Sequence, residues 1–382
     1  MEKGFAQSPR TWDTSLLALV RWNWEKTIWT AVVILALVAR LYGLSWRAMS
    51  HDESLHSLYS WQLYDGRGYE HNPMMHGPYL FHINVLFYFL FGVNDATARV
   101  AVALTGTVMV ALLWCLRPWL GRVGALAAAI MMTISPSLLY YSRYIRHDVL
   151  LTLWELVLVI AVFRYLQDRQ ERWLYWAAVA LSLAYATMEA SYLFIVMLVS
   201  FLVVYLFVRF WCEQWDRPRN RLLFSTAFVL GGSSAIVALY SVIKADPGQL
   251  SPLAPLFAAG LILLLWALYL LFTGLGQRIR AYLEMDILLW LLSLSLPLFS
   301  AFLIKLMGWD PLDYSSAGIV RSGSVLLVMA MAAIAIGWGW AGQRWLVGAG
   351  LFYAVFLTLF TTFFTNGKGF ATGIIGSLGY WM

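Results

Sequence analysis

The sequence predicts an all-α polytopic membrane protein, a bundle of about 11 transmembrane helices. Hydrophobic residues make up 61% of its 382 residues, charged residues only 12%, and the mean hydropathy is +0.71. A soluble domain averages near half apolar and a quarter charged. Apolar runs of about twenty residues recur along the chain, which suits spanning helices better than the alternating strands of a barrel. No repeat or linker divides residues 1–382, so we expect a single transmembrane domain.

Basic residues beside the apolar runs predict the orientation. The first predicted span is preceded by Lys3, Arg10, Arg21 and Lys26, which places the N-terminus in the cytoplasm and Asp52 outside. With eleven spans, sixteen of the 26 lysines and arginines lie inside. The net charge of +6 is therefore interpreted as an orientation signal and an attraction to anionic membrane lipids, with no nucleic-acid partner. The predicted spans are 27–46, 95–116, 123–141, 149–165, 173–188, 190–209, 222–243, 255–273, 286–305, 321–341 and 345–365.

Two segments are expected outside the membrane on the external side. In the first external loop, 50–94, the stretch from Tyr79 to Gly92 is apolar but too short to span, so we expect interfacial or re-entrant helices there. A span at this point would also place the later arginine-rich loops outside, against the positive-inside rule. The Gly-rich tail, 366–382, either makes tight bends near a ligand or is a flexible loop.

The first external loop begins with the acidic pair Asp52 and Glu53. One interpretation is structural, because acids at the start of a helix are favoured by its macrodipole. A catalytic role is the alternative, and the two are compatible. A second polar group, with Arg143, Arg146 and Asp148, lies at the outer mouth of two later spans, where charges are costly unless they are paired or functional.

Arg143 and Arg146 are three residues apart, so on a helix they would share a face and could bind a phosphate with forked donors. A salt bridge to Asp148 or Asp52 is the alternative. Residues 51–82 hold five of the six histidines. His51, Asp52 and His56 are plausible ligands for a divalent metal ion, although no spacing matches a defined zinc pattern, and histidine also serves at membrane interfaces.

Five motifs taken together resemble the N-terminal half of the GT-C class of membrane glycosyltransferases. This class includes protein O-mannosyltransferases, lipid A aminoarabinose transferases and oligosaccharyltransferases. The resemblance covers about residues 27–165 and is nearest to prokaryotic members of the O-mannosyltransferase-like branch, some of them labelled as flippase activity-associated. The motifs are HDES, HNPMMHGPYLFH, FGVNDATAR, RPWLGRVGALAAAI and SPSLLYYSRYIRHD.

The resemblance implies a polyprenyl-phosphate-linked sugar as donor, an extracytoplasmic active site and juxtamembrane helices in the first external loop. It implies that Asp52 lies at the reaction centre with Glu53 beside it, and that Asp148 is the second acid. Relatives often carry Lys-Pro-Pro where this chain has His76-Gly77-Pro78, so the lysine expected at the donor phosphate is absent and His76 is the candidate in its place.

We therefore expect a glycosyltransferase of the plasma membrane that uses Asp52 as base toward an acceptor hydroxyl. Cations beside the phosphate leaving group, from Arg143, Arg146, His76 or a metal ion, would support that chemistry. Two alternatives remain. One is a flippase or transporter component for lipid-linked sugars, and the other is a catalytically silent subunit of a membrane complex.

Overall fold

The computed structural model describes residues 23–244 and 253–382, and within these ranges the regular structure is entirely helical. The predicted all-α polytopic fold is confirmed. The basic residues Lys3, Arg10 and Arg21, on which part of the predicted orientation rests, lie outside the described residues. The α-helices are α2 (Trp24–Leu41), α3 (His51–Tyr64), α4 (Tyr79–Phe91), α5 (Asp95–Leu112), α6 (Arg117–Ile134), α7 (Pro136–Tyr141), α8 (His147–Asp168), α9 (Glu171–Tyr185), α10 (Ala190–Cys212), α11 (Pro218–Lys244), α12 (Ala254–Leu275), α13 (Leu283–Ser295), α14 (Ser300–Leu306), α15 (Ser316–Ala341), α16 (Gln343–Phe360), α17 (Lys368–Ala371) and α18 (Ser377–Tyr380).

Short helical turns connect or extend these helices. Four are 3₁₀ turns and the last is a π-helical turn near the C-terminus. They are η1 (Pro73–Met75), η2 (Leu113–Leu116), η3 (Gly276–Ala281), η4 (Leu296–Phe299) and η5 (Thr372–Gly376).

Among the described residues, eight helical stretches are long and apolar enough to cross a membrane, so the predicted count of eleven is not confirmed. Each of the eleven predicted ranges nevertheless overlaps a helix. Two helices that are predicted as spans are not among the eight. α2 carries three charged residues, Glu25, Lys26 and Arg40, and α9 has only 15 residues. The third difference arises because Asp95–Ile134 is one of the eight candidate stretches, although it contains the two helices α5 and α6.

α5 and α6 are antiparallel, with the chain reversing near Gly121, whose φ of +71° is a conformation that favours glycine. Arg40 of α2 contacts both α5 and α6. Its guanidinium donates to the Met132 carbonyl of α6 at 3.1 Å, and it also lies beside Gly106 of α5. Trp29 lies toward the N-terminal end of α2, where it packs in a cluster that includes Leu113 and Ala125.

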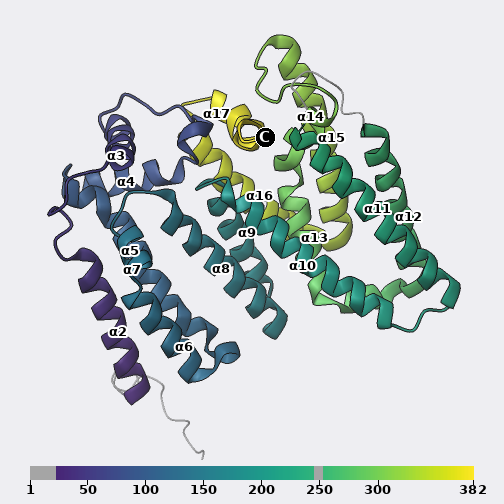
Figure 1. The fold of residues 1–382 in the computed structure, drawn as a ribbon, viewed down its shortest axis with the longest axis horizontal. Coiled ribbons are helices and arrows are strands. Elements are labelled where there is room, and N and C mark those ends of the chain that lie inside the picture. The colour runs from purple at the N-terminus through teal and green to yellow at the C-terminus, as the bar shows by residue number, and fades with distance from the viewer. Residues whose placement is uncertain (1–22, 245–252) are drawn as a thin grey trace, which may run out of the picture.

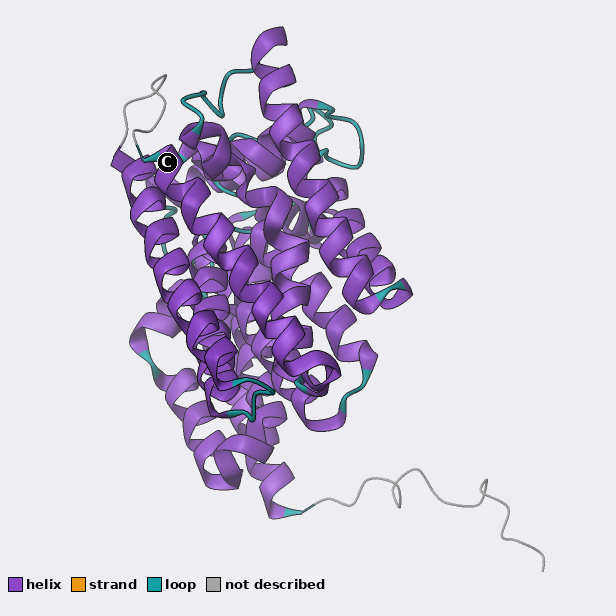
Figure 2. Ribbon diagram, turned by 90° about the vertical axis from the view of Figure 1, so that its right-hand side faces the viewer, coloured by secondary structure: helices purple, strands orange, loops and turns teal. Residues whose placement is uncertain are grey.

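The main hydrophobic core is built around α9, which packs against α8 and α16 (Figure 1). Four alanines of α9 are almost fully buried, and Ser182 donates to the Phe352 carbonyl of α16 at 2.8 Å. Small side chains on α9 thus allow close helix packing. Most of the long helices run roughly side by side from one end of the molecule to the other (Figure 2).

The loop 50–94, which is predicted to be external, folds as expected into helices that are too short to span a membrane. α4 has 13 residues, too few to cross a bilayer, and it packs against α3 and α5. α3, α4 and α17 lie at the same end of the molecule, next to the C-terminus (Figure 1). The Gly-rich tail is folded onto this loop, since the Thr372 hydroxyl lies 3.0 Å from the Nδ1 atom of His71.

Close packing surrounds several glycines of this tail. A Cβ atom on Gly369 would overlap the Phe360 carbonyl, and one on Gly379 would lie 2.9 Å from Pro311. The two interpretations of the tail, tight bends near a ligand and a flexible loop, stay predictions.

Candidate functional site

α3 starts with a capping box, and the side chains of its two acids, Asp52 and Glu53, point in different directions. The Ser50 hydroxyl accepts from the Glu53 N–H, and the Glu53 carboxylate accepts from the Ser50 N–H at 3.2 Å. The structural interpretation of the acidic pair, a helix N-terminus, is thus confirmed. Because successive residues on a helix point about 100° apart, Glu53 turns into the protein while Asp52 faces outward.

Glu53 is fully buried and its carboxylate is occupied by protein partners. Arg99 donates to it through Nε at 2.9 Å, Arg47 through Nη2 at 2.8 Å, and the Ile145 N–H at 3.3 Å. Burial by itself raises the pKa of Glu53, but the hydrogen bond and charge of Arg99, the Ser50 N–H and Arg47 outweigh burial and hold the pKa below its usual range. These contacts favour a structural role for Glu53 in place of the expected catalytic one.

Asp52 and Asp148 converge on Arg146. The Arg146 Nη1 atom lies 3.7 Å from Asp52 Oδ2, and its Nε atom lies 3.2 Å from Asp148 Oδ2. All three side chains are between one third and one half exposed. Two polar groups almost a hundred residues apart therefore form one open cluster, and the alternative of a salt bridge for Arg146 is confirmed.

Arg143 has a different environment from Arg146. Both lie in the turn between α7 and α8, so the expectation that they share a helix face is wrong. The Arg143 guanidinium donates to the carbonyls of Ala39 at 2.7 Å and Gly43 at 3.2 Å, at the C-terminal end of α2. Cations at this end of a helix satisfy its last carbonyl groups. Arg143 thus fixes α2 to the turn that carries Arg146.

Three histidine rings extend the acidic cluster inward. His56 and His147 are 5.0 Å apart between ring centroids, and His76 and His147 are 5.3 Å apart. Burial lowers the pKa of His56 to about 4, and the charge of His76 adds to this effect, so His56 is neutral at pH 7. The Nδ1 atoms of His56 and His147 are buried and have no hydrogen-bond partner among the described residues.

His76 is fixed by residues from two distant parts of the sequence. Its Nδ1 atom is 2.7 Å from a Glu189 carboxylate oxygen, and its ring is stacked on Trp381 with centroids 5.6 Å apart. Its φ of +64° is unusual for a residue with a side chain. Next to it, Gly77 donates its N–H to the Thr187 carbonyl at 3.1 Å. His76 is thus oriented by the turn before α10 and by the C-terminal segment.

No group of three or more histidine, cysteine, aspartate or glutamate side chains between 23–244 and 253–382 could hold a metal ion. His51 is exposed, whereas His56 is buried with its ring edge-to-face against Phe81 and His147. The divalent ion therefore stays an untested prediction, and no step proposed below needs one.

Sequence reasoning misses Arg99 but indicates Glu189 as a functional candidate from its location, with a structural hydrogen-bond role as the alternative. Arg99 lies within the FGVNDATAR motif, so its presence among the motifs was a signal. Glu189 lies alone in the turn ATMEAS between two apolar runs, and such an isolated acid at a membrane surface is the signal for it.

Comparison with known proteins identifies a family for part of the chain. Residues 75–234 match the family described as dolichyl-phosphate-mannose-protein mannosyltransferase. The resemblance to membrane glycosyltransferases is confirmed. The matched range includes His76, Arg146, Asp148 and Glu189 but begins after Asp52. Together with the long apolar helices, it supports an integral membrane protein.

Two other comparisons give little further information. No curated protein matches the sequence. Among solved structures, the chain is similar to the crystal structure of the Archaeoglobus fulgidus oligosaccharyltransferase tethered to an acceptor peptide, with 14% identity and a TM-score of 0.42. The match covers 90% of this chain and 50% of that one, so the chain spans about half the length of that protein.

Proposed function

We propose that this chain is a membrane glycosyltransferase that moves a sugar from a polyprenyl-phosphate donor to an acceptor hydroxyl on the extracytoplasmic face. The convergence of Asp52 and Asp148 on Arg146 carries this proposal. It places carboxylates and a cation together at one end of the bundle, partly exposed, beside the buried His56 and His147, whose Nδ1 atoms have no partner among the described residues. The match to a mannosyltransferase family supports sugar transfer as the reaction.

Asp52 is the proposed base. It accepts the proton of the acceptor hydroxyl while the oxygen attacks C1 of the sugar and the bond from C1 to the phosphate oxygen breaks. The phosphate then leaves with the electron pair of that bond and remains attached to the polyprenyl chain. Asp52 suits this role better than Glu53, because it is 48% exposed and, among the described residues, forms an ion pair only with Arg146, at 3.7 Å.

Arg146 is the proposed donor-phosphate ligand, and His76 is the candidate second one. A guanidinium stabilises negative charge that grows on the leaving phosphate. His76 is held 2.7 Å from a Glu189 carboxylate oxygen and occupies the position where relatives often carry a lysine. Asp148 forms an ion pair with the Nε atom of Arg146 and thereby orients its guanidinium. The sugar and the acceptor are not specified by these contacts.

The test is sugar transfer by the purified chain with a synthetic polyprenyl-phosphate hexose as donor. We expect Asp52→Asn to lower the rate by about a hundred- to ten-thousand-fold, the contribution typical of a general base. Asp65→Asn is the matched control, because it removes an equally exposed acid from the other end of α3. A well-folded Asp52→Asn protein with full transfer activity would refute the assignment of the base.

The same preparation separates the two alternatives. A flippase component would move lipid-linked sugar across liposomes without transferring it, and Asp52→Asn would leave that movement unchanged. A silent subunit would neither bind the donor nor transfer sugar by itself, and it would co-purify with fixed partners.

A further inference from the structure

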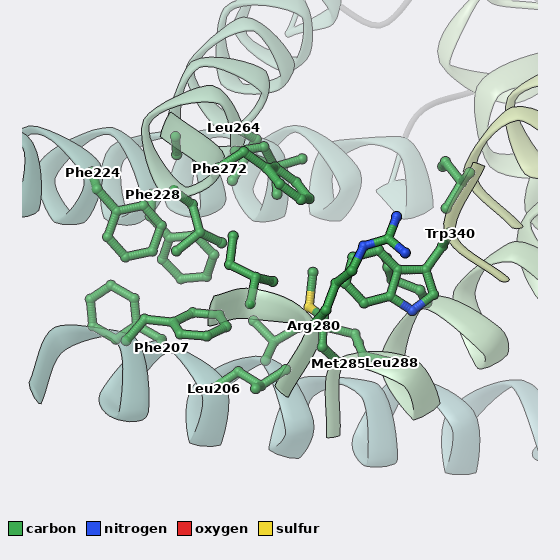
Figure 3. A pocket seen from close by; sticks show the side chains of 18 of the residues that line it. Leu206, Phe207, Phe224, Phe228, Leu264, Phe272, Arg280, Met285, Leu288 and Trp340 are labelled. Carbon is green, nitrogen blue, oxygen red and sulfur yellow. The ribbon is translucent and has the colours of Figure 1, made fainter. Parts of the chain in front are cut away.

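A large apolar cavity lies far from the acidic cluster, between the α11–α12 pair and the rest of the bundle. Its volume is about 680 Å³, within the usual range for ligand pockets. α11 and α12 pack closely on each other, since a Cβ on Gly231 would lie 2.8 Å from the Gly260 carbonyl. Together with α10, α13 and α15 they line the cavity (Figure 3).

The two ends of this cavity differ in character. Figure 3 shows the rings of Phe207, Phe224 and Phe228 at one end and the side chains of Arg280 and Trp340 at the other. The lining between them is largely leucine, with Met285. An apolar channel that ends at a cation matches a molecule with a hydrocarbon chain and an anionic head.

Arg280 is available for such a head group. Its guanidinium carbon lies 5.3 Å from the centre of the Trp340 ring, and no ion pair to it is recorded among the described residues. The nearby carboxylate of Asp286 already accepts hydrogen bonds from the Trp340 indole at 2.6 Å and the Tyr165 hydroxyl at 2.7 Å. Stacking on an aromatic face leaves the guanidinium N–H groups free to bind a phosphate.

The cavity lies at the opposite end of the bundle from the acidic cluster. α10 begins beside Glu189, and its first cavity residue is Val203, fourteen positions further on. At 1.5 Å per residue this is a distance of roughly 20 Å along the helix axis. The cavity is also lined by the C-terminal halves of α12 and α15, by Phe224 and Phe228 in the N-terminal half of α11, and by α13 between residues 285 and 292.

We propose that this cavity binds one anionic phospholipid, with an acyl chain against the phenylalanines and the phosphate on Arg280. Basic residues are concentrated in the connections at this end, which the positive-inside rule assigns to the cytoplasmic leaflet, where anionic lipids are abundant. A polyprenyl-phosphate donor does not fit this arrangement, because its phosphate would lie a helix length away from Arg146. The lipid site is independent of the proposed sugar transfer.

Native mass spectrometry of the purified, delipidated full chain tests the head-group contact. Phosphatidylglycerol and phosphatidylcholine with identical acyl chains are titrated separately. We expect the chain to prefer phosphatidylglycerol, and Arg280→Gln to weaken its binding about tenfold, the usual effect of losing one charge-assisted contact. Arg219→Gln is the control, because it removes an exposed cation at the same end outside the cavity. Equal effects of the two substitutions, or no preference in the wild type, would overturn the proposal.

A second pair of variants tests whether the lipid enters the cavity. Gly339 lines it on α15, and a Cβ there meets no atom within 4 Å, so Gly339→Leu has room to begin a side chain that occupies part of the cavity. Gly323→Leu on the same helix has equally open surroundings but lies outside the cavity. We expect Gly339→Leu to reduce binding of both lipids and Gly323→Leu to leave it unchanged. Unchanged binding in Gly339→Leu would show that the lipid lies elsewhere.

Discussion

At the scale of single residues, Asp52 and Glu53 show how two adjacent acids acquire different roles. Glu53 is fully buried between Arg99 and Arg47, whereas Asp52 is half exposed. A buried ion pair need not add net stability, but removal of one partner leaves an uncompensated charge without water. The two acids should therefore respond differently to the same chemical change.

Glu53→Gln is expected to destabilise the protein by about 3–5 kcal/mol, because it leaves the buried guanidinium of Arg99 without a counter-charge. Thermal unfolding in detergent, followed by intrinsic tryptophan fluorescence, measures the change. Asp52→Asn serves as the comparison and should unfold near the wild-type temperature. Similar unfolding temperatures for both variants would contradict the structural role of Glu53.

At the scale of elements, the site depends on one contact between the loop before α4 and the turn before α10. Gly77 and Tyr79 donate their N–H groups to the carbonyls of Thr187 and Ala186. His147 of α8 joins the same contact, since its Nε2 atom is 3.1 Å from the Gly77 carbonyl. The backbone of the loop approaches so closely that no side chain fits at position 77.

Gly77→Ala should therefore disturb the site without changing its chemistry. Its Cβ would overlap the Ala186 carbonyl, and we expect overpacking of this kind to cost about 1–3 kcal/mol and to lower sugar transfer through misplacement of His76. Both the unfolding temperature and the transfer rate are measured. Gly124→Ala in α6 is the control, where the new methyl group makes an ordinary contact 3.7 Å from Leu120. A Gly77→Ala protein that matches this control in both measurements would contradict the claim that no side chain fits at position 77.

At the scale of the whole molecule, the external loop, the start of α8 and the C-terminal segment meet at one end of the bundle, and the arginine-rich connections lie at the other (Figure 1). The positive-inside rule assigns the second end to the cytoplasm. The proposed function therefore requires Asp52 and Arg217 on opposite sides of the membrane.

Labelling with a membrane-impermeant maleimide tests this orientation. In a chain with Cys115 and Cys212 replaced by serine, Asp65→Cys in the external loop should react in intact cells. Arg217→Cys, between α10 and α11, should react only after the membrane is permeabilised. Reaction of both positions under the same condition would contradict the predicted topology.

Much of this architecture could be predicted from hydropathy and charge. Every predicted span overlaps a helix, α4 is too short to span, and the acidic loop meets the start of α8. These features follow from local composition, which a sequence displays directly. The partner of each charged side chain does not follow from local composition, because the two partners lie far apart in the sequence. Arg143 binds carbonyls of α2 about a hundred residues away, and His76 binds Glu189.

The pairing of Glu53 with Arg99 also has a consequence for how this chain can change through evolution. A substitution at either position alone exposes the other charge to a dry interior, so single steps are selected against. The two positions should therefore vary together, with relatives carrying either both charges or an apolar pair of similar volume. Asp52, which has no such obligate partner, should vary only with the chemistry that it performs.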